Sequence, residues 1–209
     1  MPAAVNLFEL ADLDAAARRA LSTRTEADLA PYQASVAKIV AAVREEGDAA
    51  VARFGREFDQ ADLTPDRLKA TPAEFDAAER AVEPEVKAAI DFAVENIRRV
   101  HERQKPERMW LETVRPGVLA GERYTPIPSV ACYVPRGKGA FPSVMMMTTV
   151  PAVIAGVPEI AVMTPPTPDG GVDGASLVAA RRAGVEAVYK CGGAVAVAAA
   201  AFGTATIPR

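Results

Sequence analysis

The chain has 209 residues, of which 50% are hydrophobic and 24% are charged, so it is long enough for one or two globular domains with a substantial core. Its net charge of −3 and pI near 5.4 argue against nucleic acid or an anionic membrane surface as a partner. The longest apolar run, residues 144–157, is too short to cross a bilayer, and the N-terminus does not have the form of a secretory signal. Cys132 and Cys191 lie in apolar surroundings that predict reduced core thiols in a cytoplasmic protein.

Residues 7–104 have the apolar periodicity of helices. A short first helix is predicted over residues 12–21 and a second over residues 31–46. Gly47 ends the second helix, and Asp48 is placed to cap a third.

Two further helices have clear start signals. Thr71 and Glu74 have the form of a capping box, with Pro72 at the first helical position. Pro84 opens the longest helix, which carries a narrow apolar stripe of Val86, Ile90, Ala93, Ile97 and Val100. Such a stripe packs either on the body of the protein or on a second subunit.

The second half of the chain has a different pattern. Residues 110–125 predict a β-hairpin that turns at Pro116 and Gly117. Strands are then predicted over residues 130–134, 160–164 and 185–189, with helices over 143–156, 173–183 and 194–202. Pro151 is expected to kink or split the first of these helices. The fold class is therefore α/β: an N-terminal helical segment with a β-hairpin, residues 1–125, followed by an incomplete Rossmann-like parallel sheet unit, residues 126–209.

The turn after the first predicted parallel strand is the first candidate site. Residues 135–139 carry two cations, Arg136 and Lys138, and two glycines ahead of a helix that begins at Pro142. A helix N-terminus of this kind is suited to a phosphate, although an ordinary connection between a strand and a helix has the same features. Because ligands bind at the carboxyl edge of a parallel sheet, this turn is expected to lie beside Gly192 and Gly193.

Residues 204–207 have the pattern of the beginning of another element. A parallel sheet ending there would leave an unsatisfied edge, so a C-terminal part of the protein is expected beyond the sequence given.

Several short motifs together resemble the N-terminal half of the histidinol dehydrogenase family. They occur in family order at residues 96–97 with His101 and Gln104, and at 115–118, 128–135, 142–144, 150–152, 155–157, 192–194 and 201–204. The resemblance implies two incomplete Rossmann-like units, a homodimer, and an NAD- and zinc-dependent oxidation of an amino alcohol.

The resemblance also implies cofactor-binding residues. Tyr133, at the end of the Tyr-Val-Pro strand, would line the NAD site. Arg136 and Gly137 depart from the family, which usually has two glycines there. They are predicted to bind the cofactor together with Gly193 from the loops themselves, because positive charge and helix N-termini suit its pyrophosphate. The family's next NAD residue is a glutamine, and that position here is Val195, which cannot form the hydrogen bonds of an amide.

The zinc ligands and the glutamate–histidine acid/base pair of the family fall in its other half. This chain has a single histidine, His101, which cannot supply both a zinc site and a base, so we expect no catalytic residue and no metal ligand here. The chain alone is therefore expected to be inactive.

Three hypotheses remain open for function. The chain is the N-terminal portion of an enzyme that oxidises L-histidinol to L-histidine, one half of an enzyme completed by a second C-terminal chain, or a non-catalytic nucleotide-binding remnant. A family branch that acts on sulfonated diols is a further alternative, because Arg136 and Lys138 suit an anionic substrate as well as a pyrophosphate. All of these predict a small-molecule alcohol or nucleotide as ligand.

Overall fold

The computed structural model describes residues 7–22, 30–137 and 139–209. The chain forms two compact units, residues 1–35 and 36–209. Within the first unit, the described residues form a short 3-10 turn, η1 (Leu10–Asp12), and helix α1 (Ala15–Ser22). The predicted helix over residues 12–21 therefore begins later, because Asp14 caps it by accepting a hydrogen bond from the backbone N–H of Ala17 at 2.7 Å.

The helical part of the second unit follows the predicted order. Helix α2 (Ala30–Glu46) runs into it from the first unit, and α3 (Asp48–Phe58), η2 (Pro65–Arg67), α4 (Pro72–Ala81) and α5 (Pro84–Gln104) follow. The capping box of Thr71 and Glu74 is present, as predicted. The predicted cap at Asp48 is wrong: Gly47 occupies the N-cap with φ +57°, and an Asp48 carboxylate oxygen instead accepts a hydrogen bond from the Thr206 hydroxyl at 2.6 Å.

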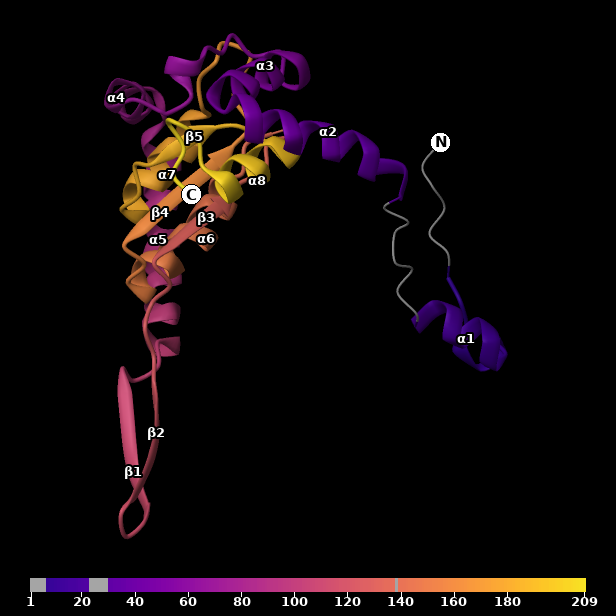
Figure 1. Ribbon diagram of the computed structural model, residues 1–209, viewed down its shortest axis with the longest axis vertical. Helices are drawn as coiled ribbons and strands as arrows, with labels where there is room; N and C mark the ends of the chain where they lie inside the picture. Colours follow the sequence, from indigo (N-terminus) through magenta and orange to yellow (C-terminus); the bar gives the residue numbers. More distant parts are fainter. Residues whose placement is uncertain (1–6, 23–29, 138) are drawn as a thin grey trace. The chain divides into compact units, whose positions relative to one another are not determined.

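A three-stranded parallel sheet forms the centre of this unit, in the order β3 (Ser129–Tyr133), β4 (Glu159–Thr164), β5 (Val188–Lys190) (Figure 1). Helices α6 (Pro142–Ala155), α7 (Gly174–Ala183) and α8 (Gly193–Phe202) alternate with the strands. The α/β fold class is confirmed, and Pro151 lies inside α6 without splitting it.

The third strand was predicted three residues too early. Val185 belongs to the end of α7, where Gly184 is left-handed and the Val185 N–H bonds to the Ala180 carbonyl at 2.9 Å. The backbone reaches β4 only at Ala187, whose carbonyl accepts from the Val162 N–H at 2.8 Å, and the paired residues begin at Val188. The chain must complete the helix cap before it can enter the sheet.

Alternate residues of the central strand face two separate cores. Val162 belongs to the core formed with α4, α5, α6 and α7, whereas Ala161 and Met163 belong to the core formed with α2, α3 and α8. Both faces of β4 are therefore covered, as expected for a parallel sheet. Cys132 and Cys191 are buried free thiols in these two cores, as predicted.

The antiparallel hairpin lies outside both cores. Strands β1 (Met109–Arg115) and β2 (Val118–Arg123) pair with each other and extend away from the parallel sheet (Figure 1). Every residue of both strands is exposed. A two-stranded ribbon is marginally stable by itself in water, so this hairpin needs cover. Its exposed apolar side chains are Met109, Trp110, Leu111, Val114, Val118 and Leu119.

Residues 204–207 do not begin a strand or a helix, contrary to prediction. The Thr204 N–H bonds to the Ile207 carbonyl at 2.8 Å, and the Ile207 side chain is buried. This turn closes the end of the second core instead of extending the sheet. The predicted division at residue 125 stays a prediction. None of the described helices is long and apolar enough to cross a membrane.

Candidate functional site

Tyr133 and Gly193 meet at the carboxyl edge of the sheet. Tyr133 is the last residue of β3, and Gly193 is the first residue of α8, just beyond β5. The backbone N–H of Gly193 donates a hydrogen bond to the Tyr133 hydroxyl oxygen at 3.1 Å. The predicted approach of these two turns is confirmed.

Both glycines of the second turn have a structural reason. A Cβ at Gly192 would lie 2.5 Å from Cγ of Pro165, so any side chain would push against the end of β4. Gly193 has φ +55°, which side chains rarely permit, and a Cβ there would meet nothing within 4 Å. The pair lets α8 start close to the sheet edge while leaving space in front of its first turn.

A pocket of about 290 Å³ opens at this edge. Tyr133, Arg136, Gly193 and Val195 line it, whereas Gly137 does not, and Lys138 lies outside the described residues. The structure therefore brings together four of the five residues predicted to bind a cofactor. The remaining lining consists of Ile39, Val51, Phe54, Gly55, Phe58, Asp59, Pro165, Cys191, Gly192 and Ala194.

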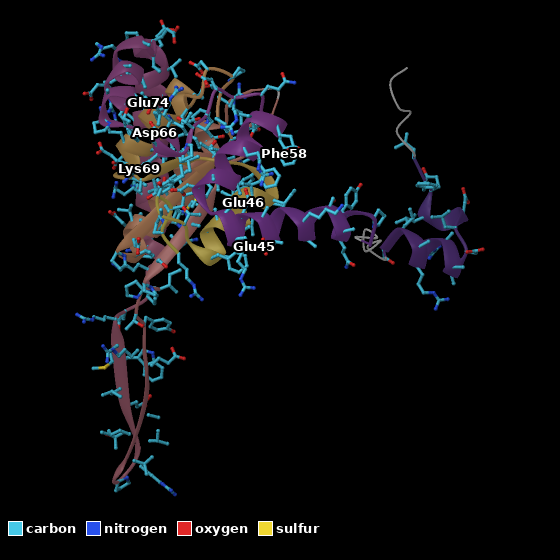
Figure 2. The ribbon with its side chains drawn as sticks, turned by 45° about the horizontal axis from the view of Figure 1, so that its top comes forward. Glu45, Glu46, Phe58, Asp66, Lys69 and Glu74 are labelled. Atoms are coloured by element: carbon cyan, nitrogen blue, oxygen red, sulfur yellow. The ribbon has the colours of Figure 1, made fainter. Side chains whose placement is uncertain are left out.

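The wall formed by α2 and α3 was missed from the sequence. Phe54 and Phe58 stack with ring centroids 5.2 Å apart, and Phe58 remains 54% exposed at the end of α3 (Figure 2). Their spacing indicates the core face of an amphipathic helix, which Phe54 also serves. The sequence signal that could have pointed to this wall is the pair Phe58 and Asp59, an aromatic and an acidic residue at the end of a predicted helix.

Two opposite charges line the same pocket. Arg136 donates a hydrogen bond to the Pro166 carbonyl at 3.3 Å, which holds it near the end of β4. Partial burial raises the pKa of Asp59 above its usual value, and the charge of Arg136 opposes that rise. A ligand entering here meets a guanidinium, a carboxylate and aromatic rings.

Cys191 lines the pocket but is not a nucleophile. Burial and, to a smaller extent, the charge of Asp59 raise its pKa to about 12, so the thiolate is scarce near neutral pH. Burial also raises the pKa of Cys132, whose sulfur contacts the Thr148 carbonyl oxygen. Both thiols serve packing.

A larger pocket of about 710 Å³ lies between the C-terminal ends of α5 and α6 and the base of the hairpin. His101, Lys105, Arg108 and Tyr124 are among its lining residues, and none of the five predicted cofactor residues is. The hairpin leads into the start of β3, and α6 leads into the start of β4. The larger pocket therefore lies at the amino edge of the sheet, away from the turn after Tyr133. We therefore assign the predicted site to the smaller pocket.

The described residues contain no group of three His, Cys, Asp or Glu side chains arranged to hold a metal ion.

The family model for histidinol dehydrogenase matches residues 22–209. The chain belongs to the histidinol dehydrogenase family. The resemblance seen in the sequence motifs is thereby confirmed.

Relatives within this family agree over most of the chain. A histidinol dehydrogenase homolog from Cereibacter sphaeroides is 64% identical over 204 residues, covering 97% of this chain and 46% of the relative. A histidinol dehydrogenase from Synechocystis is 48% identical over 189 residues, covering 90% of this chain and 44% of the relative. The chain thus spans a little under half the length of these histidinol dehydrogenase relatives.

The fold also matches a solved member of the family. The crystal structure of histidinol dehydrogenase from Elizabethkingia anophelis superposes with a TM-score of 0.82 at 31% sequence identity. That match covers 90% of this chain and 42% of the solved chain. The two-sided sheet unit with its helices is therefore an arrangement that a histidinol dehydrogenase adopts.

Proposed function

We propose that this chain supplies the dinucleotide-binding part of an oxidoreductase that converts L-histidinol, or a related small alcohol, to its oxidised product. The observation that carries the proposal is the pocket at the sheet edge of a histidinol dehydrogenase family member, where Tyr133, Arg136 and the start of α8 meet. NAD, when bound, accepts a hydride from the alcohol carbon. The chain's own residues hold and orient it.

Each proposed binding residue has a distinct role. The Tyr133 hydroxyl accepts from Gly193 and keeps its own O–H free to donate to a ligand, while the residue is 41% exposed. Arg136 suits a pyrophosphate oxygen, which also favours the N-terminus of α8. Val195 is buried in the first turn of α8 and offers only apolar contact.

The size of the pocket limits what this chain binds alone. About 290 Å³ lies near the lower end of the roughly 300–1,000 Å³ of small-molecule sites, so it accommodates part of a dinucleotide. We therefore propose weak binding by the isolated chain, with the rest of the site supplied by a further portion of the enzyme or by a complementing chain.

Zinc does not fit the described residues. A catalytic zinc site needs about three protein ligands, whereas the sequence contains one histidine and its two cysteines are buried in separate cores. We derive no metal-dependent step from this chain. The metal site and the general base are proposed to belong to the portion that the longer relatives have in addition.

Binding without turnover is the expected result for the purified chain. Calorimetric titration with NAD should show weak binding, and L-histidinol with zinc should produce no NADH. Tyr133→Phe and Arg136→Ala should each weaken binding about 10-fold, the effect of losing one hydrogen bond to a charged or polar ligand group. Arg99→Ala, an exposed arginine on α5 outside the pocket, is the control.

If wild-type chain fails to bind millimolar NAD, the dinucleotide assignment is wrong. If it binds and neither pocket variant weakens the affinity, the site lies elsewhere. Steady NADH production would show that the chain contains its own catalytic groups.

A different alcohol is the second candidate substrate. Relatives that are named histidinol dehydrogenase homologs are 46–64% identical to this chain, and similar proteins named histidinol dehydrogenase are 40–48% identical. Arg136 at the sheet edge suits an anionic group such as a sulfonate. Comparing sulfonated diols with L-histidinol as substrates of the completed enzyme separates the two.

We further propose that the exposed hairpin associates with a second copy or with the complementing chain. Leu111 is 60% exposed and Leu119 66% exposed on a ribbon that buries none of its residues. Light scattering at micromolar concentration should show self-association that Leu111→Asp reduces and Glu112→Asp does not. A monodisperse wild-type monomer would contradict this.

A further inference from the structure

Among the described residues, Asp59 is the one acidic side chain that lines the small pocket. It follows the last residue of α3, and its backbone N–H bonds to the Gly55 carbonyl at 3.1 Å. Its carboxylate, in contrast, makes no hydrogen bond or ion pair to any part of the chain that the structure describes. A half-buried carboxylate without a donor is costly in a folded protein, and it therefore invites a functional explanation.

The backbone beside Asp59 is held in an uncommon conformation. Gln60 has φ +53°, the only described residue other than glycine with positive φ. The Ala61 N–H shares the Gly55 carbonyl with Asp59, at 3.2 Å, and so fixes this turn at the end of α3. Because a non-glycine residue rarely adopts such a conformation, the surrounding structure determines where Asp59 lies.

Arg136 is the basic side chain among the described residues that lines this pocket with Asp59. It lines the same pocket and influences the ionisation of Asp59 through its charge, but the two form no ion pair among the described residues. Asp59 and Cys191, which directly follows β5, line the same pocket, and the charge of Asp59 contributes to the raised pKa of that thiol. The two charges thus remain available to different groups of one ligand.

The pocket presents three kinds of chemistry in a small volume. The stacked rings of Phe54 and Phe58 offer an apolar aromatic wall, Arg136 offers donors for a phosphate, and Asp59 offers acceptor oxygens. A nucleotide has a matching set, namely a base, a phosphate and a ribose. Of these, only the ribose diol supplies adjacent O–H donors to a carboxylate.

We infer that Asp59 binds the vicinal hydroxyl groups of a ribose in the bound dinucleotide, and that it disfavours a ribose carrying a phosphate there. This inference rests on the proposed binding of NAD in the same pocket. Either ribose of NAD could supply the diol, and the shared chemistry is a neutral diol facing a carboxylate.

The test compares NAD, NADP, AMP and nicotinamide mononucleotide by equilibrium titration of wild-type chain, Asp59→Asn and Asp59→Ala. Glu57→Gln, an exposed acid on α3 that does not line the pocket, is the matched control. Loss of the carboxylate should lower the affinity for NAD about 10- to 100-fold, as expected for hydrogen bonds to a charged group. Glu57→Gln should leave the affinity unchanged.

The mononucleotide arms identify the ribose. If AMP loses affinity in Asp59→Asn, the adenosine ribose is bound, and wild-type chain should also prefer NAD to NADP by at least about 10-fold, a preference that the variant loses. If nicotinamide mononucleotide loses affinity instead, the other ribose is bound. Both results support the inference.

Three results would overturn it. NAD binding that is equally tight in wild type and both Asp59 variants would remove the role of Asp59 while leaving the NAD site standing. Affinity lost together with a lower melting temperature in Asp59→Asn would make Asp59 structural, because an unpaired carboxylate should not stabilise the fold. No NAD binding by wild-type chain would remove both this inference and the proposed function.

Discussion

Replacing Glu74 with alanine should lower the free energy of unfolding by about 3–5 kcal/mol, because it leaves a buried ammonium without a partner. The Lys190 side chain is 2% exposed, and its Nζ lies 2.6 Å from a Glu74 carboxylate oxygen. The other carboxylate oxygen accepts from the Thr71 N–H at 2.7 Å in the capping box. In a chain of this size the melting temperature should fall by roughly 6–20 °C, at about 2–4 °C per kcal/mol.

Matched variants separate the ion pair from the cap. Thr71→Ala removes only the capping contribution and should cost about 1 kcal/mol. Glu74→Gln with Lys190→Met removes both charges and should cost less than Glu74→Ala, since no buried charge is left unpaired. Thermal unfolding followed by circular dichroism measures all three. Equal losses for Thr71→Ala and Glu74→Ala would show that Lys190 does not depend on Glu74.

The same pair should also make stability depend on pH. Burial raises the pKa of Glu74, but hydrogen bonds from Lys190 and Thr71 outweigh it, so the net pKa is below the usual 4.5. The pair therefore contributes fully above the pKa of the unfolded chain, and the contribution is lost as the pH falls through the lower folded value. The Glu74→Gln variant should lose this part of the acid sensitivity.

Local signals predicted most of the fold. The capping box at Thr71, the proline at the start of α5 and the Tyr-Val-Pro strand end are each encoded within a few residues, and each is present. The errors occurred where distant contacts decide. Asp48 does not cap α3 because Gly47 holds the N-cap position, and the Asp48 carboxylate bonds instead to Thr206, far along the chain. Residues 204–207 form a turn because the Ile207 side chain is buried in the core formed with α2, α3 and α8.

The candidate site divides in the same way. Tyr133, Arg136 and Gly193 follow from the rule that loops at the carboxyl ends of parallel strands gather at one edge. Phe58 is the last residue of α3 and Asp59 follows it, in the helical segment far from the strands in sequence, and only tertiary packing brings that helix end to the sheet. No spacing in the sequence predicts that the end of α3 lies at the edge of the sheet. The missed residues thus belong to the helices that cover the edge, and not to the strands that define it.

Truncating Ile90 should destabilise the chain by about 2–5 kcal/mol, the usual cost of Ile→Ala in a packed core. The apolar stripe of α5 was expected to face either the protein body or a second subunit. In the structure, the central residues of the stripe pack on the protein body. Ile90 is 3% exposed, and Ala93 and Ile97 pack against the same core, which α6 and α7 complete. The two end residues of the stripe are exposed to solvent, Val86 by 38% and Val100 by 56%.

Phe92 on the same helix provides the control, because it is larger than Ile90 but 71% exposed. Phe92→Ala should change the free energy of unfolding by less than about 0.5 kcal/mol, since surface substitutions remove few contacts. Denaturant unfolding of both variants, together with light scattering, distinguishes core from interface. If Ile90→Ala dissociates an assembly while the unfolding free energy of the single chain stays constant, the stripe is an intersubunit surface. We expect instead a large loss of stability with no change in oligomeric state, because Ile90 is already buried within one chain, in the core that includes α6 and α7.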